Sequence, residues 1–293
     1  MKFFISAILF LLSINCYAFS ITWLGTTCIV VSDGKTSLLF DPFITRPSLW
    51  DFISLQKVKS DKKLIEKWLA KVDADKMVAI LPSHTHYDHA MDLVEVQRQT
   101  GAKIYGSQSA LNIAKGGKVA SEKMQQVSFN QLLTIGAFKI RILEATHPPH
   151  LFNILFLAGK IEAPLESPAA LYQYTVGESF SYMITHPDGT ILYHPAGFAT
   201  AIQSPLKKPK ANIVIQGTAN RKSTEDLIEK VLLPYQAEIV IPVHYDDMFS
   251  ALKKGIVVRS RSDMQEFNRT MKSRLPKVKV LRPKYGEKVT YRF

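Results

Sequence analysis

Three histidines and one aspartate lie within six positions of the chain, in segment 83–89, which reads Ser-His-Thr-His-Tyr-Asp-His. Imidazole and carboxylate groups are the ligands that Zn²⁺ and similar cations prefer. In an extended segment His84 and His86 point to the same side, whereas Asp88 and His89, just inside a helix start, can turn toward a neighbouring point. The spacing therefore predicts one loop that serves two metal ions. The alternative interpretation is an exposed histidine-rich loop whose side chains satisfy the amides of a helix terminus.

The pattern His-x-His-x-Asp-His, with an apolar strand before it and a helix after it, resembles the signature of the metallo-β-lactamase superfamily. The resemblance covers essentially the whole chain after residue 18. It includes Trp-Leu-Gly at 23–25, Asp-Pro at 41–42, a histidine after a strand at His147, and a histidine at the end of a late strand at His244. It implies an α/β fold, a four-layer αββα sandwich of the metallo-β-lactamase type.

The resemblance also implies a set of metal ligands. One ion would be held by His84, His86 and His147, and the second by Asp88, His89 and His244. Asp41 would orient a ligand histidine, a role that carboxylates often fill in metal sites. Zinc is the expected ion, at one or two per chain, and the same ligand types suit iron or manganese.

One position departs from the family pattern. Most members with two metals supply a bridging aspartate from a Gly-Asp pair after a strand near the middle of the chain, but segment 191–198 here reads Ile-Leu-Tyr-His-Pro-Ala-Gly-Phe. Counting from Tyr193 places Gly197 at the position of that aspartate. Two divalent ions would then face a single ligand carboxylate, Asp88. We therefore expect the second ion to bind more weakly, and a bound water to be more acidic because less protein charge neutralises the ions.

The expected reaction is a hydrolysis in which a metal-bound hydroxide attacks an ester, lactone, amide or phosphodiester, with Asp88 holding the proton of the water. The sequence contains no Gly-x-Ser-x-Gly, Gly-x-x-x-x-Gly-Lys or Cys-x-x-Cys motif that would point to another chemistry. Within the superfamily, the chain resembles the lactonase and phosphodiesterase-like branch more than the antibiotic-degrading enzymes. The alternative is a non-catalytic envelope binding protein with a vestigial or single structural metal site.

Four further side chains are candidates for the walls of the pocket. His150 follows His147 by three positions, and His194 lies close to the position of the lost aspartate. Tyr172 and Tyr174 belong to segment 148–178, which is rich in proline and aromatic residues. A connection of this length in a compact domain is commonly a functional lid, so we expect a lid here. Packing of the two tyrosines against the domain is the alternative.

Strands and helices must position these residues, and hydrophobic periodicity predicts where they lie. Strands are expected at residues 20–24, 28–31, 37–40, 77–81, 102–105, 139–145, 180–185, 190–193, 211–216, 238–243 and 278–281. Helices are expected at residues 62–71, 90–100, 107–115, 224–233 and 262–275, with Ser223 as the N-cap of the fourth. Strands followed by helices in each half fit two facing sheets with helices outside.

The composition is that of a folded globular protein, since 46% of the 293 residues are apolar and 21% are charged. The formal net charge of +12 favours anionic partners. We expect a small-molecule or lipid-like substrate, anionic ones included, and peripheral contact with an anionic membrane surface, whereas no nucleic acid is expected. Cys28 lies in an apolar run and is expected to be a buried, inert thiol.

The first 18 residues have the pattern of a secretory signal peptide. Lys2 precedes an apolar run from residue 3 to residue 14, and Cys16 and Ala18 are the small residues before a cleavage site. A membrane-spanning helix needs about 20 apolar residues, so a membrane anchor is the less favoured alternative, as is lipid attachment at Cys16. We therefore expect residues 1–18 to be removed, and residues 19–293 to form one metallo-β-lactamase-like domain that is periplasmic or secreted.

Overall fold

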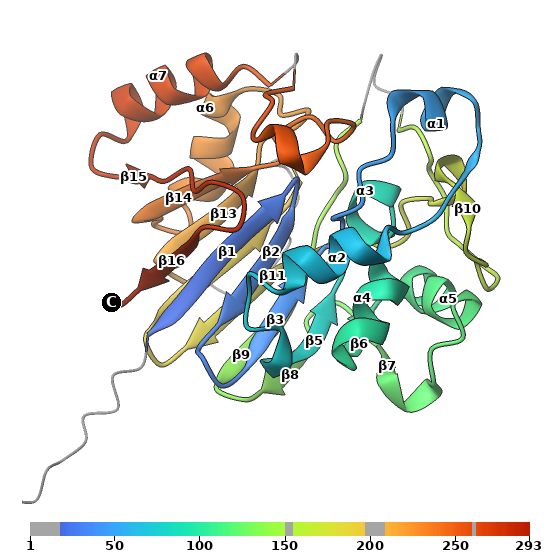
Figure 1. The fold of residues 1–293 in the computed structure, drawn as a ribbon. Helices are drawn as coiled ribbons and strands as arrows, with labels where there is room; N and C mark the ends of the chain where they lie inside the picture. The colour runs from blue at the N-terminus through green and yellow to red at the C-terminus, as the bar shows by residue number, and fades with distance from the viewer. Residues whose placement is uncertain (1–17, 150–154, 197–208, 260–261) are drawn as a thin grey trace, which may run out of the picture.

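Two sheets of seven strands each face one another, and helices cover their outer faces (Figure 1). The structure is a computed structural model that describes residues 18–149, 155–196, 209–259 and 262–293. Two short strands, β4 (Lys57–Val58) and β10 (Ala169–Ala170), form a separate small sheet. The predicted α/β architecture, a four-layer αββα sandwich, is confirmed.

Both large sheets mix parallel and antiparallel strands. The spatial order in the first sheet is β16 (Lys288–Tyr291), β1 (Phe19–Gly25), β2 (Cys28–Ser32), β3 (Ser37–Phe40), β5 (Met77–Leu81), β6 (Lys103–Gly106) and β7 (Met124–Gln126). The order in the second sheet is β15 (Lys279–Val280), β14 (Ile239–Val243), β13 (Ile213–Gly217), β12 (Gly189–His194), β11 (Phe180–His186), β9 (Phe138–Glu144) and β8 (Leu132–Ile135).

The helices lie in two groups, one for each sheet (Figure 1). On the side of the first sheet are α1 (Leu49–Ile53), α2 (Lys62–Leu69), α3 (Tyr87–Ala90), α4 (Leu93–Thr100) and α5 (Gln108–Gly116). The second sheet carries α6 (Thr224–Leu227), which continues into a π-helical turn at Ile228–Leu232, and α7 (Met264–Arg274). As predicted, Ser223 is the N-cap of α6, and its side chain accepts a hydrogen bond from the backbone of Asp226.

Alternation along the strands divides the apolar side chains between two cores. In β2, Ile29 and Val31 belong to the core between the two sheets, whereas Cys28 and Val30 belong to the core under the outer helices. Both faces of the strand are buried, which explains its continuous apolar run. The expectation that the Cys28 thiol is buried is confirmed, and burial raises its pKa to about 12, which favours the protonated, less reactive form.

The helix predicted at residues 90–100 forms as α4, which begins only at Leu93, and the separate short helix α3 precedes it and ends at Ala90. The break between the two helices includes Asp92. Its buried carboxylate accepts hydrogen bonds of 2.6 Å from the backbone N–H groups of both Ile44 and Thr45. These two residues belong to the connection between β3 and α1. A contact with a segment distant in sequence therefore overrides the local helical pattern. The first of the two helices, α3, carries Asp88 and His89.

Several short elements are present that the sequence does not predict, among them α1, β7, β8 and β16. β16 pairs antiparallel with β1, and the register joins Phe19 to Tyr291. Lys288–Tyr291 has only one fully buried side chain, so its own hydrophobic pattern is weak. Its strand conformation depends on a partner at the other end of the sequence, which local periodicity does not reveal.

The strands that precede the candidate site end at the same edge of the sandwich. In the second sheet β12, β13 and β14 run parallel, and β9 shares their direction because both β9 and β12 are antiparallel to β11. Figure 1 shows α3, which follows β5 of the first sheet, at the end of the sandwich where α1 also lies. The fold thus brings the loops after β5, β9 and β14 together.

Some of the predicted features fall outside the described residues. These are the signal peptide except for Ala18, the pocket candidate His150, and Gly197 at the position of the missing aspartate. Among the residues that are described, no helix has the length and apolar character needed to cross a membrane.

Candidate metal centre

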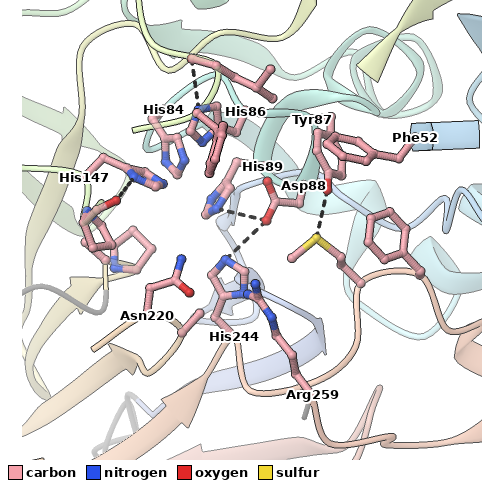
Figure 2. A pocket seen from close by; sticks show the side chains of 18 of the residues that line it. Phe52, His84, His86, Tyr87, Asp88, His89, His147, Asn220, His244 and Arg259 are labelled. Carbon is pink, nitrogen blue, oxygen red and sulfur yellow. Dashed lines mark hydrogen bonds and ion pairs between the residues drawn. The ribbon is translucent and has the colours of Figure 1, made fainter. Parts of the chain in front are cut away.

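Six side chains from three separate parts of the chain converge at one end of the sandwich (Figure 2). They form two triads, and within each triad the candidate ligand atoms lie within 4.8 Å of one another. The first triad is His84, His86 and His147, and the second triad is Asp88, His89 and His244. The structure therefore brings together the same two groups that the resemblance implies. Four members come from the loop after β5 and from α3, one follows β9, and one follows β14.

In the first triad the three imidazole rings surround a common point. The centroid of the His84 ring lies 4.9 Å from that of His86 and 4.8 Å from that of His147, and the last two are 4.6 Å apart. His86 Nε2 lies 3.2 Å from the carbonyl oxygen of Leu157, and His147 Nδ1 lies 2.7 Å from that of Pro148 (Figure 2). A carbonyl only accepts, so these nitrogens donate, which leaves a lone pair on the other nitrogen of each ring.

His84 is buried and held in its neutral form. Burial, assisted by the neighbouring histidines, holds the pKa of His84 well below the ordinary value of 6.5. Its Nδ1 lies 3.1 Å from Ser83 Oγ, while its Nε2 is buried with no hydrogen-bond partner among the described residues. A buried polar atom without a partner is costly, and a neutral imidazole is the form that binds a metal ion. The first triad therefore fits a cation with three imidazole ligands.

The second triad combines a carboxylate with two imidazoles. Asp88 Oδ2 lies 3.3 Å from His244 Nε2 and 3.7 Å from His89 Nε2. Burial opposes a charge on His89, but the carboxylates of Asp41 and Asp88 outweigh it and raise the pKa of His89. Burial alone would raise the pKa of Asp88, yet His89 and His244 hold that pKa well below its usual range. The second triad thus carries a fixed negative charge that the first triad lacks.

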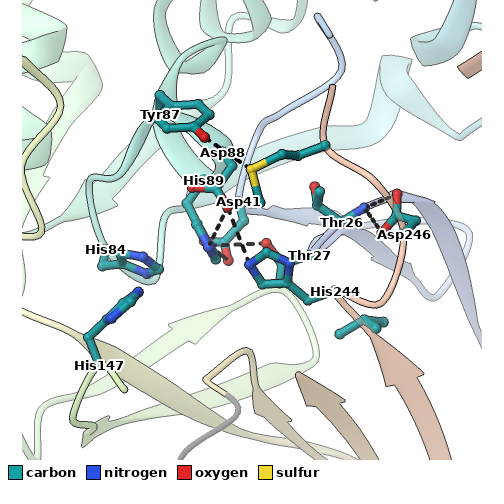
Figure 3. Close-up of polar contacts among 12 residues, drawn as sticks. Thr26, Thr27, Asp41, His84, Tyr87, Asp88, His89, His147, His244 and Asp246 are labelled. Atoms are coloured by element: carbon teal, nitrogen blue, oxygen red, sulfur yellow. Dashed lines mark hydrogen bonds and ion pairs between the residues drawn. The ribbon is translucent and has the colours of Figure 1, made fainter. Parts of the chain in front are cut away.

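Asp41 is the centre of the hydrogen bonds behind the second triad (Figure 3). Its carboxylate lies 2.7 Å from His89 Nδ1 and accepts hydrogen bonds from Ser83 N–H at 2.5 Å, Ser83 Oγ at 2.8 Å and the Tyr193 hydroxyl at 2.6 Å. Asp41 has a φ of +48°, which is uncommon for a residue with a Cβ and persists where the surroundings impose it. The position suits the expected role, since a donor bond from His89 Nδ1 leaves Nε2 facing the triad.

The turn between β1 and β2 holds the end of β14 in place. The backbone N–H of His244 donates to the carbonyl of Thr26 at 2.9 Å. In return the N–H of Thr26 donates to both carboxylate oxygens of Asp246, at 3.0 and 2.9 Å (Figure 3). Arg46 donates from Nη2 to the same carboxylate at 3.2 Å. His244 has a φ of +62°. The hydrogen bonds between this turn and the end of β14 hold the strained backbone that turns the His244 ring toward Asp88.

Thr27 and Tyr193 complete the support of His89, and the sequence does not point to either. The Thr27 hydroxyl lies 3.0 Å from His89 Nδ1. The Tyr193 hydroxyl lies 2.8 Å from the Thr27 carbonyl oxygen as well as 2.6 Å from Asp41. Thr27 lies in the turn between β1 and β2 of the first sheet, whereas Tyr193 lies on β12 of the second sheet, so only the packing of the two sheets brings them together.

Both triads open into a cavity of about 530 Å³. Its apolar wall includes Leu49 and Phe52 of α1, together with Met248 and Phe249 from the segment after β14. Polar groups are added by Asn220, Asp247 and Arg259, of which Asn220 and Arg259 are labelled in Figure 2. No motif marks these residues, because they lie on connections without a clear hydrophobic period.

Of the four extra pocket candidates, none that the structure describes is among the residues that line this cavity. His194 is fully buried on β12, with Nδ1 2.7 Å from Ser181 Oγ. Tyr174 is buried in the core under the outer helices and borders a different cavity. Tyr172 is exposed on a 3-10 turn, Leu171–Gln173, that contacts α1. The two tyrosines thus pack on the domain or face solvent, and only Phe156 and Leu157 of residues 155–178 border the cavity.

Asp88 is the single carboxylate in the two triads that the described residues form. Asp247 also borders the cavity, but its Oδ1 accepts a hydrogen bond of 3.0 Å from the backbone of Phe249. Two divalent ions in the triads would bring four positive charges against one ligand carboxylate. The excess of positive charge that the sequence predicts for a site with two metal ions is therefore also present among the described residues.

Proteins of similar sequence and fold include several metal-dependent hydrolases. The family model described as the metallo-beta-lactamase superfamily matches residues 21–163. A metal-dependent hydrolase of Ignicoccus hospitalis is 26% identical over 281 residues, which cover 93% of this chain and 98% of that protein. One of Pyrobaculum islandicum is 31% identical over 98 residues, which span 33% of this chain and only 36% of the relative. A solved structure of a metallo hydrolase from Ignicoccus hospitalis superposes with a TM-score of 0.59 at 19% identity, covering 94% of this chain and 99% of that chain.

Proposed function

The chain belongs to the metallo-β-lactamase superfamily, and from this premise we propose that it is a metal-dependent hydrolase that holds one or two zinc ions and cleaves an ester, lactone, amide or phosphodiester. The observation that carries the proposal is the convergence of the two triads on one cavity. The unpartnered Nε2 of His84 supports it, because burying that atom has no compensation unless a cation binds it.

The residues of the site would bind the metal ions, hold a proton and orient the ligand histidines. When bound, zinc lowers the pKa of a coordinated water to about 7 and polarises a carbonyl or phosphoryl oxygen. Asp88 Oδ2 faces both His89 and His244, so it is the atom placed to hold a proton released between the triads. Asp41 fixes the tautomer of His89, and the carbonyl of Leu157 does the same for His86.

The cavity walls favour a substrate with an apolar part and a polar or anionic part. Leu49 and Phe52 provide an apolar surface on one side. Arg259 lines the same cavity and forms no ion pair within 4 Å among the described residues, so its guanidinium is available to a carboxylate, phosphate or carbonyl group of the substrate. The formal net charge of +12 acts in the same direction by attracting anions.

The experiment is elemental analysis of the purified protein beside the variants His86→Ala and His244→Ala. Hydrolysis of an activated ester, a lactone and an activated phosphodiester is measured in parallel on the same samples. We expect one to two ions per wild-type chain, loss of metal from each variant, and a fall in activity that follows the metal. Asn220→Ala is the matched control, because Asn220 lines the cavity but belongs to neither triad, so it should keep the metal.

Metal identity is read from the same samples. Zinc as the dominant element supports the proposal. Iron or manganese as the dominant element would support a metal-dependent hydrolase but would show that its metal is not zinc. A wild-type protein that is metal-free and does not take up zinc, iron or manganese would overturn the proposal. The site would then be vestigial, and a non-catalytic binding protein would be the better account.

A further inference from the structure

Helix α1 displays apolar side chains to solvent instead of burying them. None of the residues in Leu49–Ile53 is buried, and the exposed fraction is 66% for Trp50 and 59% for Ile53. The helix is nonetheless well formed, because Ser48 and Asp51 make a reciprocal capping box at its start. Leu55, just beyond the helix, is 61% exposed. A contiguous set of exposed large apolar residues of this kind marks a surface that another apolar phase covers.

This helix stands at the mouth of the cavity. Leu49 and Phe52 line the cavity, and the Phe52 ring lies 5.9 Å from Tyr87 and 6.1 Å from Phe249. One side of the helix is therefore fixed to the rim by aromatic contacts. Trp50 and Ile53, which are not among the residues that line the cavity, remain on the outside of the rim.

A second apolar segment borders the same mouth. Val257 and Val258 are 39% and 51% exposed, and the next residue, Arg259, lines the cavity. The Asp247 N–H donates to the Val257 carbonyl at 2.8 Å, which ties this segment to the loop that carries Phe249. Figure 1 places α1 and the short orange helix before this segment, Leu252–Lys254, at the same end of the sandwich.

Basic residues flank both apolar segments. Lys57 and Lys59 follow α1 and are exposed, and Lys253 and Lys254 precede Val257 and are exposed as well. Asp51 is the one acidic residue of α1, and its carboxylate is engaged in the capping box with Ser48. Exposed tryptophan and aliphatic side chains with lysines beside them are the composition that seats a protein at the surface of an anionic bilayer.

We propose that the rim formed by α1 and residues 256–258 is a membrane-docking surface, by which the protein rests on a bilayer of anionic lipid with its cavity mouth turned toward the lipid. Trp50, Ile53 and Leu55 enter the interface, and the lysines contact lipid phosphates. The contacts belong to the outer surface of the protein and require no metal ion, so this inference stands or falls separately from the proposed hydrolysis.

The chain provides its own probe for the test, because it contains three tryptophans and only Trp50 is exposed. Trp23 and Trp68 are buried, at 0% and 6% exposed. The purified protein is mixed with vesicles of phosphatidylglycerol and phosphatidylcholine, and tryptophan emission and vesicle sedimentation are recorded. For the wild type we expect a blue shift of the tryptophan emission and quenching of this emission by lipids brominated in the acyl chain. In Trp50→Ser we expect neither the blue shift nor the quenching.

The binding variants separate apolar insertion from charge. Ile53→Ser should weaken vesicle partitioning by roughly tenfold, as expected for an aliphatic side chain that leaves an apolar phase. Leu233→Ser is the matched control, because Leu233 is 45% exposed but lies beyond the helix on the second sheet, and it should bind like the wild type. Lys57→Ala with Lys59→Ala should weaken binding at low salt, and little difference should remain at high salt.

Two results would overturn the proposal. The first is an unchanged Trp50 emission in the presence of phosphatidylglycerol vesicles, with the protein remaining in the supernatant. The second is a blue shift that appears without vesicles as the protein concentration rises, together with a doubled mass in light scattering, since a second copy of the chain would then cover α1.

Discussion

The two triads occupy one cavity, yet the protein supports them in different ways. In the first triad, backbone carbonyls of Leu157 and Pro148 set the orientation of two rings. In the second triad, a buried side-chain carboxylate, Asp41, orients His89, and a second one, Asp246, anchors the turn that holds His244. The first triad has no carboxylate, and the second has Asp88.

In the second triad, the negative charge of Asp88 and the protonation of His89 have opposite effects on the affinity for a metal ion. Asp88 attracts a second cation, but together with Asp41 it also raises the pKa of His89, so a proton competes for the same nitrogen. His84 in the first triad has a lowered pKa and needs no deprotonation near neutral pH. We therefore expect the first triad to bind its ion more tightly, in keeping with the missing second carboxylate.

The largest expected effect comes from Asp88→Asn. It removes the only carboxylate of the triads, so affinity for the second ion should fall by more than about 100-fold, and hydrolysis should fall with it. Zinc titration of the metal-free variant gives the measurement. Asp247→Asn is the control, since Asp247 lines the same cavity outside the triads and asparagine keeps an oxygen for the N–H of Phe249. Equal losses of affinity in the two variants would contradict the assignment of Asp88 as the carboxylate that binds the second ion.

A smaller effect is expected from Asp41→Asn. The amide still reaches Ser83 and Tyr193, but it holds His89 less firmly and carries no charge, so affinity for the second ion should fall by about 10- to 100-fold. The first ion should remain. If the variant loses both ions together, then Asp41 supports the entire site and the comparison fails.

The metal-free protein should titrate in a way that separates the triads. His89, with its raised pKa, should keep its proton to a higher pH than an ordinary histidine, whereas His84 should already be neutral. By linkage, the His89 proton stabilises the fold below the ordinary pKa of 6.5, and this contribution disappears as the pH rises through the raised pKa. His84 has the opposite effect. Because its pKa is lowered in the folded protein, the unfolded chain takes up the proton first, and the fold loses stability as the pH falls below 6.5. Nitrogen-15 spectra of the histidine rings, recorded as a function of pH, show which ring loses its proton first. A higher pKa for His84 than for His89 would refute this prediction.

The smallest effect is expected from Thr27→Val. It removes one hydroxyl that lies 3.0 Å from His89 Nδ1, while the 2.7 Å contact with Asp41 remains. A neutral hydrogen bond contributes about 1 kcal/mol, so affinity for the second ion should fall by no more than about tenfold. Zinc titration measures it. A loss as large as that of Asp41→Asn would mean that the hydroxyl, and not the carboxylate, orients the ring.

The sequence predicts the part of the site that is contiguous and leaves out the part that is assembled by packing. His84, His86, Asp88 and His89 share one loop and one helix start, so their spacing alone suggests two ions. His147 and His244 required the family resemblance, since each stands alone after its strand. The contacts of Thr26 with Asp246 and of Tyr193 with Asp41 join segments that are distant in sequence.

The same reason explains where the fold prediction was incomplete. The sequence locates the apolar strands β2 and β5 almost to the residue, because every side chain of β2 is buried and every side chain of β5 except that of Val78. α1 was missed because none of its side chains is buried and so no apolar period marks it. The break between α3 and α4 was missed because Asp92 binds the backbone of Ile44 and Thr45, far away in the chain.

The most direct test is a zinc titration of the metal-free wild-type protein and of Asp88→Asn at neutral pH, monitored by calorimetry or by a competing chromophoric chelator. We predict two binding events in the wild type, a tight one that survives in Asp88→Asn and a weaker one that this variant loses. Two equally tight binding events, or a single event that Asp88→Asn abolishes, would contradict the conclusion that the two triads bind their ions with unequal affinity.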